Sequence, residues 1–162
     1  MAEDSSYSCE YVVVDPFPSR AIRRLPGIAC IAKRVEQMPL ETFTELGSGD
    51  ILFIDSTHVL KLGSDVQFEY LEILPRLRPG VVVHVHDIFL PAEYPREWLY
   101  GGRYWSEQYL LQAFLAFNSA FQVLWSGAVM HRHRPEALMA AFPSYDAASL
   151  GPGSFWMRRL LA

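Results

Sequence analysis

Cysteine, positive charge and long hydrophobic runs are all scarce in this sequence, and each scarcity excludes a class of protein. Two cysteines in 162 residues are too few for a disulfide framework, and they favour a protein of the cytoplasm. The formal net charge of −4 argues against nucleic acid or an anionic membrane as a partner. The longest apolar runs, such as 51–54, are far shorter than the roughly 20 residues of a membrane-spanning helix.

The composition is that of a globular protein with a core. Hydrophobic residues make up 51% of the chain and charged residues 20%, which separates it from disordered sequences. The length suits one domain over residues 1–162, because two domains of this size would each be small. Residues 1–10, "MAEDSSYSCE", are predicted to form a polar tail, and their acidity is the opposite of a secretory signal.

Short apolar runs alternate with segments of helical period along the chain. Strands are predicted at 11–16, 27–34, 50–55, 78–87, 121–126 and 153–161, and helices at 19–25, 39–47, 64–77, 105–121 and 134–142. The alternation predicts an α/β fold with a mostly parallel sheet. The valine-rich strands indicate a sheet covered on both faces. The long connection 90–103, rich in proline, glycine and aromatic residues, is predicted to be a lid or binding loop.

Three predicted strands end in an aspartate, namely Asp15, Asp55 and Asp87. Ligands of open parallel sheets bind beyond the carboxyl ends of the strands, so three acids there favour a site. Asp15 has the position of a carboxylate that accepts hydrogen bonds from a ribose diol. The alternative for each is a turn or cap residue, and for Asp15 merely the end of a strand before Pro16.

A divalent metal site is the second hypothesis at the strand ends. The ligands would be Asp55, His86 and Asp87, because carboxylate oxygens with one imidazole suit such an ion. The alternative is a buried His86 beside a capping Asp87. His84 shares a strand face with His86 and is predicted to be structural.

His58 is the predicted general base, because it follows Asp55 by three residues and titrates near neutral pH. The alternative is an exposed loop histidine. A second histidine-rich tract, "HRHRP" at 131–135, lacks partners at ligand spacing and is predicted to be a solvated basic turn.

Three segments resemble the class I S-adenosylmethionine-dependent methyltransferases, in the branch that acts on small molecules. They are "VVVDPFP", "DILFIDSTHVLKLGSDVQFEYLEILPRLRPGVVVHVHDIFLPAEYPREW" and "WSEQYLLQAFLAFNSAFQVL". The resemblance runs from about residue 11 to residue 160 and implies a Rossmann-like, doubly wound sheet. It also implies that Asp15 binds the ribose of S-adenosylmethionine, that Val35 and Glu36 wall its adenine, and that Asp55 lies near its amine.

The segments are more distantly similar to the metal-dependent catechol-type O-methyltransferases. Asp55, His58, and His86 with Asp87 fall on the acid, base and acid–amide positions of those enzymes. Two departures stand out, since histidine replaces the lysine base and His-Asp replaces Asp-Asn. This more distant similarity is what implies a divalent metal such as Mg²⁺.

The first strand of that family and its glycine-rich turn have no counterpart here. The family's strand order is 3-2-1-4-5-7-6, so the missing strand lies in the middle of the sheet. Its glycines let the backbone approach the cofactor closely. Three outcomes follow: the chain is a truncated piece, the strand ending at Asp15 pairs with that ending at Asp55, or a second copy or partner chain fills the gap.

Three functions remain open from the sequence. The first is an O-methyltransferase-like domain that acts on a small hydroxylated molecule, with metal assistance if the ion is present. The second is a non-catalytic or partner-dependent remnant of the fold that binds no cofactor alone. The third is a metal-dependent hydrolase built on the same aspartates and histidines.

Overall fold

The computed structural model describes residues 9–161. The chain divides into two compact units, the first ending at Met38 and the second beginning at Pro39, and each is described by itself. Residues 1–8 of the predicted polar tail lie outside the described residues. The single domain over residues 1–162 stays a prediction.

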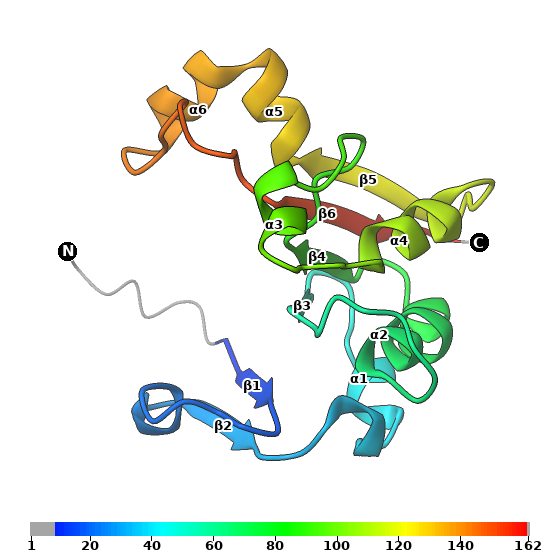
Figure 1. The fold of residues 1–162 in the computed structure, drawn as a ribbon. Helices are drawn as coiled ribbons and strands as arrows, with labels where there is room; N and C mark the ends of the chain where they lie inside the picture. Colours follow the sequence, from blue (N-terminus) through cyan, green and yellow to red (C-terminus); the bar gives the residue numbers. More distant parts are fainter. Residues whose placement is uncertain (1–8, 162) are drawn as a thin grey trace. The chain divides into compact units, whose positions relative to one another are not determined.

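The first unit is built on a pair of parallel strands (Figure 1). Its elements are β1 (Tyr11–Val14), η1 (Ile22–Arg24), β2 (Ile28–Ile31) and η2 (Val35–Gln37). The β-branched run of β1 lies opposite β2 from Tyr11 to Val14. Both strands and the short helical turn between them agree with the sequence analysis, and β1 ends immediately before Asp15.

The second unit contains a four-stranded sheet with helices from the intervening segments. Its strands are β3 (Ile51–Ile54), β4 (Val82–His86), β5 (Phe121–Ser126) and β6 (Ser154–Arg159). Its α-helices are α1 (Glu41–Thr44), α2 (Asp65–Phe68), α3 (Arg96–Tyr100), α4 (Glu107–Leu115), α5 (Gly127–His133) and α6 (Pro135–Ala141). A π-helical turn η3 (Glu69–Ile73) and a 3₁₀ turn η4 (Leu74–Arg76) extend α2.

The strand order of this sheet is β3-β4-β6-β5. β3 and β4 are parallel, whereas β6 runs antiparallel to both β4 and β5. The mixed α/β architecture confirms the predicted fold class, and the order matches the last four strands, 4-5-7-6, that the resemblance implies. β1 and β3 belong to separate sheets in the described chain, so direct pairing of the Asp15 and Asp55 strands, one of the three outcomes considered, is not found.

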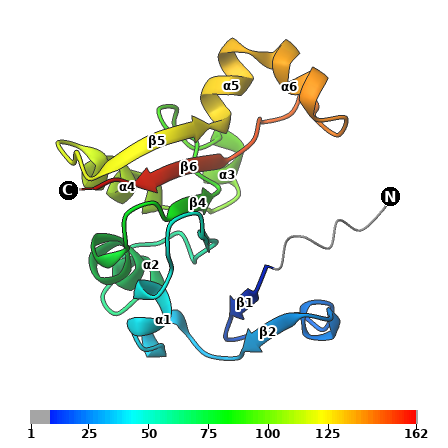
Figure 2. The ribbon, with the colours of Figure 1, turned by 180° about the vertical axis from the view of Figure 1, so that it is seen from behind.

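One face of the four-stranded sheet carries the core. Val83 and Val85 of β4 are fully buried and alternate with half-buried histidines. α3 and α4 lie on one side of the sheet, and β5 and β6 come forward when the unit is seen from behind (Figures 1 and 2). On β3, Phe53 is 55% exposed. The prediction of a sheet covered on both faces is therefore wrong for this unit, within the residues described.

Two helical segments differ from the sequence analysis for local reasons. The Ser64 hydroxyl caps α2 by accepting from the Gln67 N–H, as its N-terminal position suggests. The helix then widens into η3, so the predicted single helix over 64–77 is irregular. The tract 131–135 is not a solvated turn: His131 and His133 close α5, whose first turn is capped by the Ser126 hydroxyl. Basic residues in a last helical turn are favoured by the helix dipole.

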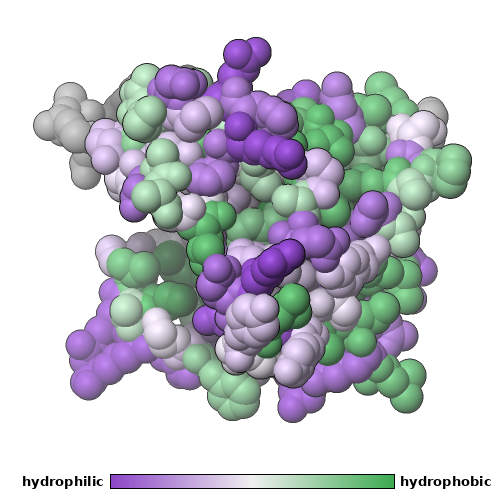
Figure 3. Space-filling view, turned by 45° about the horizontal axis from the view of Figure 1, so that its top comes forward, coloured by the Kyte–Doolittle hydropathy of each residue, from purple (hydrophilic) through white to green (hydrophobic). Residues whose placement is uncertain are grey.

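Hydrophobic residues reach the surface in several places between hydrophilic ones (Figure 3). Scattered exposure of this kind is ordinary for a globular chain. Within residues 9–161, no helix combines the length and apolar character needed to cross a membrane.

Candidate active site

The carboxyl ends of β3 and β4 are neighbours because the two strands pair in parallel, with Ile54 opposite Val85. This register brings together side chains that follow each strand. His58 Nε2 lies 3.5 Å from Asp55 Oδ1 and 4.0 Å from Asp87 Oδ2. His58 is 7% exposed and Asp55 is 52% exposed, so an almost buried imidazole faces a carboxylate open to solvent.

The other nitrogen of His58 contacts a residue that the sequence analysis missed. Glu107, at the start of α4, is fully buried, and its Oε2 lies 2.6 Å from His58 Nδ1. The Ser56 hydroxyl donates to the same oxygen at 3.0 Å, and the Tyr70 hydroxyl donates to Oε1 at 3.1 Å. Little in the sequence signals this contact, because it spans 49 residues and Glu107 stands among other polar residues at the start of its helix.

The ring and backbone of His58 also make contacts that do not involve a carboxylate. The Trp105 ring stacks on the imidazole with centroids 4.0 Å apart. The N–H groups of Ser106 and Glu107 both donate to the His58 carbonyl, at 2.9 and 3.1 Å. His58 and Asp87 have φ of 60° and 55°, a left-handed conformation that costs energy for residues other than glycine and often marks functional sites.

The predicted metal ligands are not brought together as a metal site. His86 lies in ring contact with Phe53 and His84 on the partly open sheet face, although its Nε2 is 3.4 Å from Asp87 Oδ1. The remaining ligands, Asp55 and Asp87, flank His58 instead. Across residues 9–161, no group of three or more His, Cys, Asp or Glu side chains is arranged to hold a metal ion. The arrangement therefore does not support the predicted metal.

His84 has the contacts of a structural histidine. Its ring stacks on Trp156 with centroids 4.2 Å apart and planes at 5°. Its Nε2 lies 3.1 Å from the Ser154 hydroxyl. Burial, and then the neighbouring His86, lower the pKa of His84, which keeps it neutral at physiological pH.

The residues predicted to bind the cofactor lie in both units. In the first unit, the Asp15 carboxylate accepts from the Phe17 N–H at 2.7 Å, which is a local turn contact. Val35 begins η2, and Glu36 forms a 4.0 Å ion pair with Arg34. Asp55 belongs to the second unit. The roles of these four residues toward a cofactor remain predictions.

Several opposing effects act on the pKa of His58. Burial lowers it, but the hydrogen bond to Glu107 and the negative charges of Glu107, Asp87 and Asp55 raise it by more. The pKa of His58 is therefore above the ordinary 6.5. The protonated imidazole is favoured because three carboxylates surround a ring that has little water around it.

This raised pKa predicts a pH dependence of stability. A folded-state pKa above the unfolded value stabilises the protein fully below pH 6.5, and the contribution is lost as pH rises through the folded pKa. We expect the free energy of unfolding of wild type, relative to His58→Gln, to fall across that window. Urea unfolding at a series of pH values measures it, with the exposed His133→Gln as control. A wild-type advantage that grows with pH would contradict the assignment.

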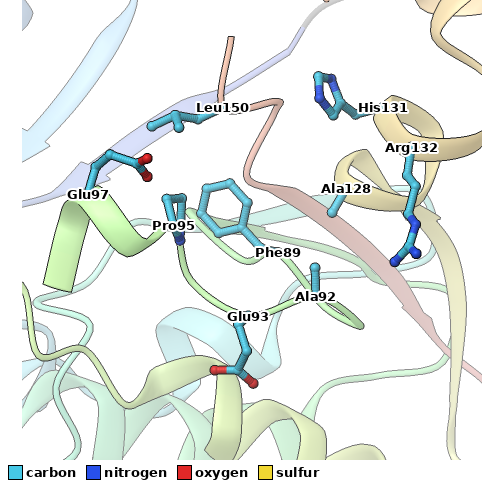
Figure 4. Close-up of a pocket in the computed structure, with 9 residues that line it drawn as sticks. All are labelled: Phe89, Ala92, Glu93, Pro95, Glu97, Ala128, His131, Arg132 and Leu150. Carbon is cyan, nitrogen blue, oxygen red and sulfur yellow. The ribbon is translucent and has the colours of Figure 1, made fainter. Parts of the chain in front are cut away.

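A cavity of about 430 Å³ opens beyond the end of β4 (Figure 4). α5 contributes Ala128, His131 and Arg132, and the segment after β4 contributes Phe89 and Pro95. The volume falls within the range of small-molecule sites, roughly 300–1,000 Å³. The cavity lining includes Phe89, two residues beyond Asp87, but none of Asp55, His58 and Asp87.

The cavity wall is tied to the helix that carries Glu107. The buried side chain of Gln108 accepts from the Phe89 N–H at 3.2 Å and donates to the Ala92 carbonyl at 3.3 Å. Its backbone N–H donates to the Tyr94 hydroxyl at 3.1 Å. Adjacent residues of α4 therefore hold the imidazole and one wall of the cavity.

The mixed α/β fold places the acid-flanked histidine at the carboxyl edge of the sheet, the edge at which open parallel sheets bind their ligands. The model of a family described as "Methyltransferase domain" matches residues 2–88. The match covers more than half of the chain, and the chain belongs to this family. It includes the strand ends at Asp55 and Asp87, whereas Glu107 lies beyond it. No curated protein and no solved structure matches the chain.

Proposed function

We propose that the chain is an S-adenosylmethionine-dependent O-methyltransferase domain that acts on a small hydroxylated molecule in the cytoplasm. Its membership of the methyltransferase family supports the transfer chemistry. The observation that carries the choice of oxygen as acceptor is His58, whose Nε2 faces the carboxylates at the two strand ends while Nδ1 contacts Glu107. Above the raised pKa of His58, where the ring is neutral, a positioned imidazole is suited to take a proton from a hydroxyl group.

In the proposed methyl transfer, His58 accepts the proton that the acceptor hydroxyl loses. When bound, S-adenosylmethionine would supply a methyl group to the acceptor oxygen and would leave as a neutral thioether. The hydroxyl proton would pass to His58 Nε2. Asp55 and Asp87 then lie 3.5 and 4.0 Å from that nitrogen and stabilise the imidazolium. Positioning of the two reactants supplies much of the rate.

The cofactor is assigned to the residues named from the sequence. Within the first unit, Asp15 is assigned to its ribose and Val35 and Glu36 to its adenine. The methyl acceptor is assigned to the strand ends beside His58 Nε2. The cavity that the predicted binding loop 90–103 lines through Ala92, Glu93, Pro95 and Glu97 does not include His58 in its lining. No step is assigned to a metal, because the described acids and histidines do not assemble a site for one.

A partner-dependent module is the second candidate function. β3 is an edge strand of its sheet in the described chain, and Ile51 and Phe53 on it are 57% and 55% exposed. An exposed apolar edge strand is a template for pairing with another chain. A second copy or a partner chain that adds a strand at β3 would give this function without cofactor binding by the chain alone.

Calorimetric titration with S-adenosylmethionine tests the proposed function. We expect measurable heat and a raised melting temperature in the presence of the cofactor. Asp15→Asn should weaken binding by about tenfold or more, because a charged acceptor is lost. Glu10→Gln, a change to an exposed acid of the same unit, is the matched control and should leave binding unchanged.

Two results would decide against this function for the chain. The first is a titration with no heat and no thermal shift. The second, which supports the module instead, is a stable dimer in size-exclusion chromatography with light scattering that also fails to bind the cofactor.

A further inference from the structure

We propose that Glu107 is a positioning residue that fixes the tautomer of His58 and leaves Nε2 free to accept a proton. The inference rests on the proposed function only for the identity of His58 as the base. The tautomer itself is a property of the folded chain and can be measured without a substrate.

The contact with Glu107 allows one neutral tautomer of His58. A carboxylate only accepts hydrogen bonds, so the 2.6 Å contact with His58 places a hydrogen on Nδ1. Ser56 and Tyr70 have hydroxyl groups that donate to the same carboxylate. Three donors around a fully buried carboxylate hold its two oxygens in place and satisfy the buried charge.

The free nitrogen then points to the proposed reaction site. With the hydrogen on Nδ1, the neutral ring has its lone pair on Nε2, which faces Asp55 and Asp87. Neither carboxylate can donate a hydrogen bond to that nitrogen when ionised. An incoming hydroxyl group is therefore the donor that Nε2 lacks.

The surroundings of His58 hold its main chain and cover one side of its ring. Trp105 stacks on one side of the ring, and the His58 N–H donates to the Ser56 hydroxyl at 3.1 Å. The backbone N–H of Glu107 itself donates to the His58 carbonyl. Glu107 consequently holds both the main chain and the ring of the same residue.

Glu107→Gln tests the inference with little change in shape. The glutamine amide can donate to Nδ1, which moves the ring hydrogen to Nε2 and blocks proton acceptance. An aspartate-to-asparagine change in a serine protease triad acts in this way and lowers the rate about 10⁴-fold. We expect a fall in kcat of about 10²- to 10⁴-fold with KM for the cofactor unchanged.

The decisive measurement is a long-range ¹H–¹⁵N correlation spectrum of histidine-labelled protein at about pH 9, where the neutral ring predominates. The His58 signals are assigned by their loss in His58→Gln. Wild type should show hydrogen on Nδ1, and Glu107→Gln should show it on Nε2. Tyr70→Phe removes only a donor to the other oxygen of Glu107, so it should keep the wild-type tautomer. Glu136→Gln, a change to an exposed acid, is the matched control and should also keep it.

A wild-type spectrum with hydrogen on Nε2 would overturn the inference, as would an unchanged tautomer in a folded Glu107→Gln protein. If glutamine prevents folding, the wild-type and Tyr70→Phe spectra still decide the assignment. Failure of the proposed function looks different, since absent cofactor binding would leave the tautomer of His58 as it is.

Discussion

His58→Gln is expected to lower the rate of methyl transfer by about 100-fold or more, because removal of a general base usually costs this much. The imidazole of His58 is nearly buried at the strand ends. Its Nδ1 lies 2.6 Å from Glu107 Oε2, so the ring is held in position. Glutamine keeps much of the side-chain volume but accepts no proton. Affinity for S-adenosylmethionine should stay within about twofold, since no contact with the cofactor is assigned to His58.

The measurement is the release of S-adenosylhomocysteine in the presence of a panel of hydroxylated small molecules, with the molecule that gives the highest wild-type rate used for all variants. His133→Gln, a change to an exposed histidine in the last turn of α5, is the matched control and should retain full activity. A rate for His58→Gln within about twofold of wild type would show that His58 is not the base.

The proximity of Asp55 and Asp87 was predictable from the sequence, because parallel strands end at the same edge of a sheet. The apolar runs before Asp55 and Asp87 predicted two strands, and strands of parallel direction bring their carboxyl ends to one edge. This is enough to place His58 near both acids, as the structure finds. The same periodicity put His84 and His86 on one face, so the interpretation of His84 as a structural residue agrees with its stacking on Trp156.

The partner of His58 was not predictable in the same way. Glu107 reaches the imidazole from α4, across 49 residues, and helical periodicity gives no information on what a helix end contacts. The metal hypothesis is not supported for a related reason. Asp87 lies between His58 and His86, at 4.0 and 3.4 Å, while Asp55 contacts His58. The three predicted ligands therefore do not converge on one point. Neither this arrangement nor the open face of the sheet is encoded in hydrophobic alternation alone.

Glu107→Ala is expected to lower the free energy of unfolding by about 3–5 kcal/mol, the usual result of removing one partner of a buried charged pair. Alanine leaves the donors on Ser56, His58 and Tyr70 without their acceptor. Tyr70 is fully buried, so water cannot readily replace the lost contact. Burial, followed by the charge and hydrogen bond of Glu107, raises the pKa of Tyr70 well above its ordinary value, which keeps the hydroxyl a donor at all relevant pH values.

Urea unfolding at pH 7 measures this loss, and Glu136→Ala on the exposed side of α6 is the matched control, expected to change stability by no more than about 0.5 kcal/mol.

The double variant Glu107→Ala with Tyr70→Phe should lower the free energy of unfolding by less than the sum of the two single changes, because removal of the tyrosine hydroxyl costs nothing more once its acceptor is gone. A loss below about 1 kcal/mol for Glu107→Ala, or strict additivity in the double variant, would mean that the carboxylate does not hold this network together. The same carboxylate would then be a poor candidate for fixing the His58 tautomer, because a group that is weakly held cannot orient its neighbour.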